Sequence, residues 1–317
     1  MSSSSSNFTS RAFIEGLDAT DPLASFRQEF VITDEDTCYL DGNSLGRLPL
    51  ATIGVVNDFL HNEWGAQMVS GWNSWIDEAQ STGDLIGRAT LGVEPGQMLA
   101  VDTTSVNFYQ LCHAAITARP GRHKVISDTA NFPTDRYILE GLCQELGCEL
   151  VLINDEDGEE YVTPEMLAPY LDDDVALVTF SVIQYRSGAL HDIARISQMT
   201  RDAGALCVWD ASHAVGVVPM QLDRDNAGLA IGCTYKYGNS GPGSPGWLYV
   251  SKSLQQELHV PIQGWFAQDD QFAMAQGFDR SPTIRGFQIA SPSIIGLRCV
   301  QTSFEMIARA GLTAIAK

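Results

Sequence analysis

The chain has 317 residues, of which 44% are apolar and 9% aromatic, enough for a large buried core. Its 39 acidic and 19 basic residues give a formal net charge of -20 and a pI near 4.5. Such a surface repels nucleic-acid backbones and anionic lipid headgroups, so we expect neither as a partner. No apolar run is long enough to span a bilayer, and no secretory or transit signal stands at the start.

The cysteines and histidines are scattered along the chain. The seven Cys include no CxxC pair, and the six His include no HExxH arrangement. The sequence therefore predicts neither a metal site nor a disulfide framework. Free core thiols are typical of a reducing compartment, so we expect a cytoplasmic protein.

The chain divides into four predicted segments. The polar, low-complexity start predicts a disordered tail over residues 1–10. An N-terminal segment follows over 11–60 and includes the turn-rich passage YLDGNSLGRLP (39–49). Residues 61–290 are expected to form a large domain that holds the functional site. Residues 291–317 are expected to begin a smaller C-terminal domain.

From about residue 97, short apolar runs alternate with amphipathic stretches of helix length. Strands are predicted over 97–101, 124–127, 149–153, 175–181, 205–210 and 246–250, and helices over 134–146, 193–203 and 293–310. The strands are apolar on both faces, which is typical of a parallel sheet covered by helices on both sides. We therefore predict an α/β fold, a three-layer sandwich around a mainly parallel sheet. In such folds, ligands bind beyond the carboxyl ends of the strands.

The strongest candidate residues follow two apolar passages. WDASHAVG (209–216) places Asp210 at the end of a predicted strand, with His213 three residues later. The next apolar passage leads to Tyr235 and Lys236 in a turn rich in Gly and Pro. Such residues suit pyridoxal 5'-phosphate, whose aldehyde takes a lysine amine and whose ring nitrogen is kept protonated by a carboxylate. The alternative is an unrelated strand-end Asp and surface Lys, and the spacing alone does not decide between them.

Two other stretches offer groups for a phosphate and a ring. TTSVNFYQL (103–111) opens a predicted helix, where the hydroxyls of Thr104 and Ser105 and free N–H groups can bind an anion. NFPTDRY (131–137) places Phe132 and Asp135 in a strand–helix turn, where the ring could stack on the cofactor and the carboxylate could bond its polar atoms. An ordinary helix cap and ordinary core packing are the alternatives.

These pieces stand in the order found in one family. YLDGNSLGRLP, TTSVNFYQL, NFPTDRYILEGL, SVIQYRSGALHDI (181–193), WDASHAVG, TYKYGNSGPGSPGWLYV (234–250) and GWFAQ (264–268) together resemble kynureninase. That family belongs to the fold type I pyridoxal-phosphate enzymes, which are similar to aspartate aminotransferase. The resemblance covers roughly residues 10 to 300, and its NFPTDRY and GWFAQ pieces are the more specific ones.

The resemblance implies a role for each candidate. Lys236 resembles the Schiff-base lysine, Asp210 the partner of the ring nitrogen, and Tyr235 a phosphate-contacting tyrosine that also takes part in proton transfer. The remaining implied cofactor contacts are Thr104 and Ser105 in the phosphate loop, Phe132 and Asp135 at the ring, Ser181, and His213. Trp265 and Ser291 resemble phosphate contacts that reach over from a second subunit. The resemblance therefore also implies a homodimer with shared active sites.

The implied reaction is hydrolysis of L-kynurenine to anthranilate and L-alanine, in tryptophan catabolism and NAD biosynthesis; 3-hydroxykynurenine is a further possible substrate. The family continues into a C-terminal domain that carries the arginine for the substrate carboxylate. Arg280, Arg285 and Arg298 do not match its context, so we expect a fragment of a longer protein, with that arginine beyond Lys317. The rival interpretations are another enzyme of the superfamily, such as a cysteine desulfurase or an aminotransferase, and a truncated non-catalytic paralogue.

Overall fold

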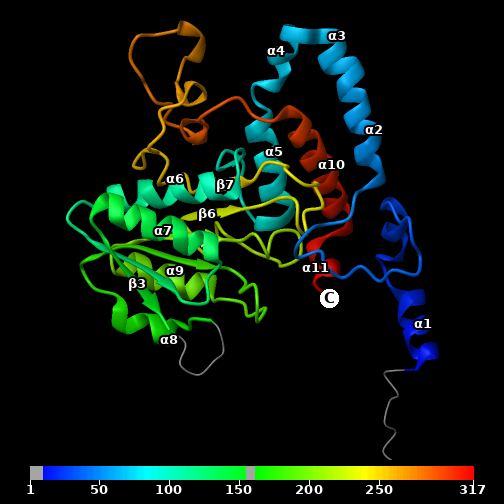
Figure 1. The fold of residues 1–317 in the computed structure, drawn as a ribbon, viewed down its shortest axis with the longest axis horizontal. Helices are drawn as coiled ribbons and strands as arrows, with labels where there is room; N and C mark the ends of the chain where they lie inside the picture. The colour runs from blue at the N-terminus through cyan, green and yellow to red at the C-terminus, as the bar shows by residue number, and fades with distance from the viewer. Residues whose placement is uncertain (1–9, 155–160) are drawn as a thin grey trace, which may run out of the picture.

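The computed structural model describes residues 10–154 and 161–317 (Figure 1). The predicted tail falls outside these residues except for Ser10, whose hydroxyl accepts a hydrogen bond from the backbone N–H of Phe13 and caps the first helix. Among the described residues, no helix combines the length and the apolar character that crossing a membrane requires.

A mixed sheet forms the centre of the described chain. Its seven strands are β1 (Met98–Ala100), β2 (Lys124–Asp128), β3 (Glu149–Ile153), β4 (Val175–Ser181), β5 (Leu206–Asp210), β6 (Leu229–Gly232) and β7 (Trp247–Val250), in the order β1-β7-β6-β5-β4-β2-β3. β7 pairs antiparallel with both of its neighbours, and the other pairings are parallel. The mainly parallel sheet predicted from the sequence is confirmed.

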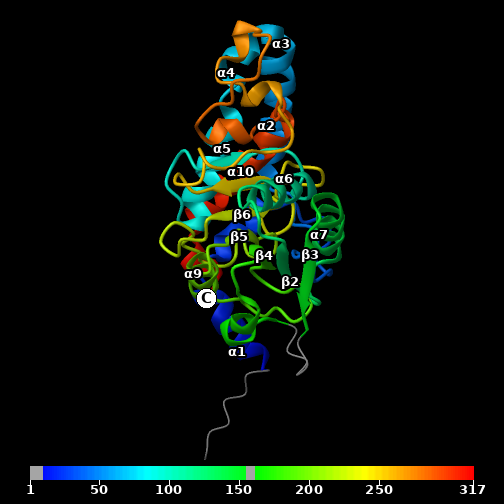
Figure 2. The ribbon, with the colours of Figure 1, turned by 90° about the vertical axis from the view of Figure 1, so that its left-hand side faces the viewer.

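The sheet lies between two hydrophobic layers, because successive residues of a strand point to opposite faces. In β5, Cys207 and Trp209 belong to one buried cluster, and Leu206 and Val208 belong to the other. Helices α6 and α7 supply the second cluster, and α9 and α10 supply the first. Figures 1 and 2 show α7 and α9 on opposite sides of the strands. The three-layer α/β fold is therefore confirmed.

The helices have the following bounds. The α-helices are α1 (Arg11–Thr20), α2 (Leu50–Asp58), α3 (Gly65–Gln67), α4 (Trp72–Trp75), α5 (Glu78–Ile86), α6 (Thr104–Thr117), α7 (Pro133–Leu146), α8 (Pro164–Leu167), α9 (Ile193–Asp202), α10 (Ile294–Ala310) and α11 (Leu312–Ile315). Short 3-10 helices are η1 (Ala24–Glu29), η3 (Met68–Gly71), η5 (Ala168–Tyr170), η6 (Trp265–Ala267), η7 (Gln271–Ala273) and η8 (Ile284–Phe287), and π-helical turns are η2 (Phe59–Trp64) and η4 (Gly87–Leu91).

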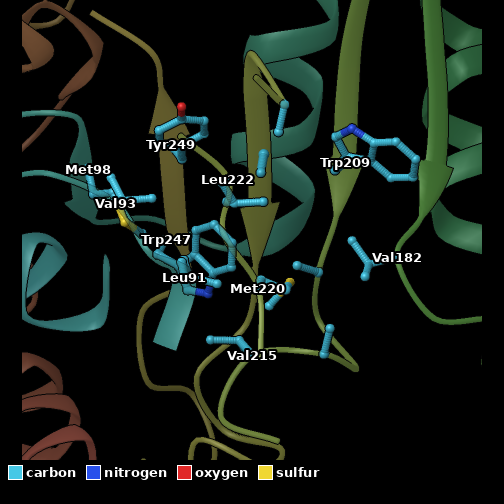
Figure 3. Close-up of a cluster of buried hydrophobic side chains, with 14 of the residues drawn as sticks. Leu91, Val93, Met98, Val182, Trp209, Val215, Met220, Leu222, Trp247 and Tyr249 are labelled. Carbon is cyan, nitrogen blue, oxygen red and sulfur yellow. The ribbon is translucent and has the colours of Figure 1, made fainter. Parts of the chain in front are cut away.

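Large aromatic side chains fill the core on the face of the sheet covered by α9 and α10. Trp209, Trp247 and Tyr249 are almost fully buried there, with Met98 and Leu222 beside them (Figure 3). The indole N–H of Trp209 donates to the hydroxyl of Ser197 at 3.0 Å, so this polar atom is satisfied within the core. Such packing makes the strands a rigid support for the loops that follow them.

A nearly buried ion-pair network joins α10 to the N-terminal helices. The Arg298 guanidinium donates to both carboxylate oxygens of Glu63, at 3.0 and 2.6 Å, and also to Glu78. Gln301 donates to the same Glu78 at 2.7 Å. Arg298 is therefore fully engaged in holding α10 against η2 and α5. The division into a large domain and a C-terminal domain that begins at residue 291 stays a prediction, while α10 supplies side chains such as Leu297 to the main core.

We expect Arg298→Met to lower the free energy of unfolding by about 3–5 kcal/mol, because it leaves two largely buried carboxylates without their cation. Urea unfolding followed by circular dichroism measures this. Arg309→Met is the matched control: its pair with Glu29 is exposed, so we expect a change below about 1 kcal/mol. Equal unfolding midpoints for the two variants would contradict this account of α10.

Candidate active site

Lys236 lies in the loop after β6, at the carboxyl end of the parallel strands. Its Nζ atom is 2.7 Å from Nε2 of His213, which lies in the turn after β5, and 5.6 Å from the centre of the Phe132 ring. Burial lowers the pKa of His213 and the nearby Lys236 lowers it further, while the backbone carbonyl of Asn43 accepts a hydrogen bond from the imidazole. The ring is therefore neutral at neutral pH and presents an uncharged nitrogen to the amine.

Two buried carboxyl groups lie next to this lysine. Asp210 is the last residue of β5, and its Oδ1 accepts the backbone N–H of Ser212 at 2.8 Å. Asp135 lies in the first turn of α7, and burial and the neighbouring Asp210 hold its pKa well above the ordinary range. Its Oδ2 atom is buried without a hydrogen-bond partner among the described residues. A buried carboxyl pair with one unpartnered oxygen fits a protonated ring nitrogen.

A buried amide ties the ring-stacking candidate to the sheet. Asn131 Oδ1 accepts the Ser181 hydroxyl at 2.8 Å and the backbone N–H of Phe132 at 2.8 Å. Its Nδ2 donates to the hydroxyl of Ser127 at 3.1 Å. Ser181 is the last residue of β4, and its side chain lies beside the loop that contains Asn131. The structure thus brings Phe132 and Ser181 together, through an asparagine that the sequence did not single out.

The N-terminus of α6 faces the loop that carries Lys236. Thr103 caps this helix by accepting the backbone N–H of Val106, so Thr104 and Ser105 occupy its first turn. A side chain added at Gly246 would meet the backbone nitrogen of Thr104 at 3.1 Å, which places the end of the lysine loop against this turn. The N–H groups and hydroxyls of a helix start form a site for a phosphate.

Tyr235 precedes the lysine and is half-buried. Burial raises the pKa of its phenol, and the nearby Cys233 and Asp210 raise it further, so the hydroxyl keeps its proton at neutral pH. The backbone carbonyl of Tyr235 accepts the N–H of Gly46 at 2.9 Å. The GNSLG turn (42–46) therefore packs directly on the segment that carries the two candidate catalytic residues.

This contact leaves no room for a side chain at Gly46. A Cβ atom there would lie 2.2 Å from the carbonyl oxygen of Lys236. We expect Gly46→Ala to lower stability by about 1–3 kcal/mol and to weaken cofactor binding, because the lysine segment must shift. Gly54→Ala is the control, since nothing lies within 4 Å of the added atom and alanine favours helix α2. Thermal unfolding with and without cofactor checks both variants; an unchanged Gly46→Ala protein would contradict the expectation.

Trp265 and Ser291 make their contacts with other segments of the chain. The Trp265 indole donates to the backbone carbonyl of Gln271 at 2.8 Å, and its ring packs edge-on against Phe266 at 5.2 Å. Ser291 lines a hollow of about 570 Å³ with Trp64 and other apolar side chains of the N-terminal helices. Among the described residues, neither side chain has a recorded contact with Lys236. Their predicted role on a second subunit stays a prediction.

Several polar residues near this site were not among the candidates predicted from the sequence. Besides Asn131, they are Asp128, Gln184 and Cys233. Asn131 is the first residue of the NFPTDRY motif, Asp128 lies three residues before it, and Gln184 lies inside SVIQYRSG, so the signal for these three lay in or beside the motifs. What the motifs could not provide was which polar side chains point inward and bond to one another.

The comparisons with known proteins agree with this geometry. The class-V aminotransferase family matches residues 102–317, so the chain belongs to that class. A kynureninase of Pseudomonas fluorescens is 35% identical over 315 residues, which cover 97% of this chain and 73% of that protein. A kynureninase of Burkholderia pseudomallei (strain 1106a) is 35% identical over 94% of this chain and 71% of that protein. The chain therefore belongs to the kynureninase family, as its motifs indicated.

Solved structures show the same fold at lower identity. An apo cysteine desulfurase from Thermococcus onnurineus NA1 superposes with a TM-score of 0.75 at 16% identity, covering 94% of this chain and 72% of that one. The cysteine desulfurase CsdA from Escherichia coli gives 0.76 at 15% identity, covering 92% and 73%. The cofactor is pyridoxal 5'-phosphate, as predicted, and the unpartnered carboxyl oxygen of Asp135 and the amine of Lys236 fit it chemically.

Proposed function

We propose that this protein hydrolyses L-kynurenine to anthranilate and L-alanine. The observation that carries the proposal is the Lys236 amine, held 2.7 Å from His213 and beside a buried carboxyl pair, in a chain that is 35% identical to kynureninases. The pathway follows from the substrate: tryptophan catabolism and, where 3-hydroxykynurenine is accepted, NAD biosynthesis. The cytoplasmic location stays a prediction.

In this proposal the side chains have the following tasks. Pyridoxal phosphate, when bound, supplies the aldehyde that takes the substrate amine and the ring that withdraws electrons. Lys236 removes the proton from the substrate α-carbon, and His213 orients the amine for that transfer. Asp210 keeps the ring nitrogen protonated. Tyr235, whose phenol is neutral, donates a proton in the steps around the cleaved carbon–carbon bond.

The phosphate and the second subunit complete the site. Thr104 and Ser105 bind the phosphate at the start of α6, and Phe132 covers one face of the ring. Trp265 contacts Gln271 and Phe266, and Ser291 lines a hollow with the N-terminal helices, so we propose that they reach the site of a second copy in a homodimer. Sedimentation of the purified protein tests the dimer, and a monomer that still binds the phosphate with full affinity would contradict this assignment.

The three arginines considered as carboxylate anchors each have a protein partner, although Nε and Nη1 of Arg280 are buried without one among the described residues. Arg298 is held by Glu63 and Glu78, Arg280 donates to the backbone carbonyl of Gln255 at 2.9 Å, and Arg285 donates to Gln271 at 3.1 Å. A carboxylate anchor orients the substrate, so we expect cofactor binding with only weak turnover of kynurenine wherever no arginine reaches the substrate carboxylate.

Fluorescence of released anthranilate tests the activity directly. Kynurenine and 3-hydroxykynurenine are each added to protein loaded with pyridoxal phosphate, and cysteine is added in parallel with sulfide detection. Anthranilate release above the rate of an equal load of Lys236→Ala protein supports the proposal. Sulfide release without anthranilate would indicate the desulfurase alternative, and neither product from a chain extended to the full length of its relatives would indicate a non-catalytic paralogue.

A further inference from the structure

A buried hydrogen bond joins two loops at the carboxyl end of the sheet. Gln184, in the loop 182–190 after β4, donates its amide N–H to Oδ1 of Asp128 at 3.0 Å, at the end of β2. Asp128 is 2% exposed and Gln184 is 1% exposed. The roles proposed above use neither side chain. An acid in so enclosed a place therefore needs its own explanation.

Keeping this acid ionised works against stability. Burial raises the pKa of Asp128 to about 6, and the hydrogen bond from Gln184 is the largest of the effects that oppose the rise. The charged groups that face it are Arg136, which lowers its pKa slightly, and Asp135, whose own pKa it helps to raise. Since the folded pKa lies above that of the unfolded chain, this group's contribution to stability declines as the pH rises from about 4 to about 6.

Both loops lead to the same aromatic pair. The backbone N–H of Asn131 donates to the backbone carbonyl of Asp128 at 3.4 Å, the backbone N–H groups of Ala130 and Asn131 both lower the pKa of the Asp128 carboxyl, and Phe132 follows them directly. Gln184 is followed by Tyr185, whose ring packs edge-on against Phe132, with 5.3 Å between centroids and 85° between planes. The two loops are thus joined twice, by the buried Asp128–Gln184 bond and by the contact of the two rings.

We propose that Asp128 is a positioning residue for the cofactor: by holding Gln184 it fixes Tyr185 in its perpendicular contact with Phe132, and so fixes the ring on which the cofactor stacks. This inference rests on the proposed role of Phe132 in the site. Lys236 Nζ lies 5.6 Å from the same ring, so a tilt of Phe132 changes the cofactor's angle to the amine. This role explains why Asp128 is buried at the site: its charge lowers the stability of the fold, but its hydrogen bond orders the cofactor-binding loops.

Asp128→Asn tests the proposal because it keeps the shape and removes the charge. A charge-assisted hydrogen bond becomes a neutral one, so we expect the dissociation constant of pyridoxal phosphate to rise about fivefold. The visible circular dichroism per bound cofactor should also change, because it depends on ring orientation. The melting temperature of the cofactor-free protein at pH 7 should not fall, since the penalty for burying the charge is gone. A lower melting temperature with unchanged dichroism would mean that Asp128 is only structural.

Gln184→Met breaks the same bond from the other side. This variant should also raise the dissociation constant of pyridoxal phosphate. The double variant should raise it by a factor smaller than the product of the two single factors. Thr129→Ala is the matched control, because Thr129 is exposed and its hydroxyl donates to Asn154 instead. Additive effects, or an effect of Thr129→Ala equal to that of Asp128→Asn, would overturn the proposal. Lys236→Ala, measured beside them, separates failure of this inference from failure of the site itself.

Discussion

Lys236→Ala is expected to abolish covalent attachment of the cofactor and to lower anthranilate release by about a thousandfold or more, because it removes the amine that both holds the cofactor and moves the substrate α-proton. The visible absorbance of the loaded protein should be lost. After borohydride treatment of the unmodified protein, peptide mass spectrometry should find the pyridoxyl group on Lys236. Its position beside His213 and Phe132 is the reason for expecting one labelled lysine.

Lys252→Ala is the control for this experiment. Lys252 is exposed and follows β7, where its backbone N–H donates to Gln97 at 2.7 Å, and it lines a hollow that includes none of the candidate cofactor contacts. That variant should keep the absorbance and the full rate. Pyridoxyl label on Lys252, or an undiminished visible band in Lys236→Ala, would contradict the assignment of the site.

The fold was predictable wherever the sequence pattern was local. Strand β4 is buried along its whole length and apolar except at Thr179 and Ser181, and the predicted range 175–181 agrees with the structure residue for residue. The glycine after Leu146 ends α7 in a left-handed conformation, as a helix terminator should. The antiparallel course of β7 was not predictable, because a short apolar run shows burial but not direction.

The residues of the site could be predicted from motifs, but the contacts between them could not. Asp210 and Lys236 could be placed at strand ends, and parallel strands bring such ends together. The mutual effect of Asp135 and Asp210 needs coordinates, because the two residues are 75 positions apart in the chain and only the fold brings the first turn of α7 near the end of β5. The same holds for Asp128 and Gln184. Burial of polar groups is a property of the packed fold, and an apolar–polar pattern does not encode it.

The second large effect is expected from Asp210→Asn, which should lower kynurenine turnover by about a hundredfold while the cofactor still attaches to Lys236. A carboxylate next to a basic nitrogen raises that nitrogen's pKa by one to three units, and an amide does not. Absorbance of the loaded protein measures attachment, and anthranilate fluorescence measures turnover. Asp202→Asn is the control, since Asp202 is exposed at the end of α9 and bonds only Gln198 in the described chain.

Stability of the cofactor-free protein separates this effect from misfolding. Asp210 helps to hold the pKa of Asp135 above its ordinary value of 3.8, so the folded chain keeps a proton there that the unfolded chain releases. Stability from this group is therefore full at low pH and declines as the pH rises above about 4. Because Asp210→Asn removes a neighbouring charge that raises this pKa, the melting temperature of the variant should fall less between pH 4 and pH 7 than that of the unmodified protein. A steeper fall of the melting temperature in the variant would show that Asp210 does not raise the pKa of Asp135. The carboxyl pair would then be no argument for a protonated ring nitrogen beside it.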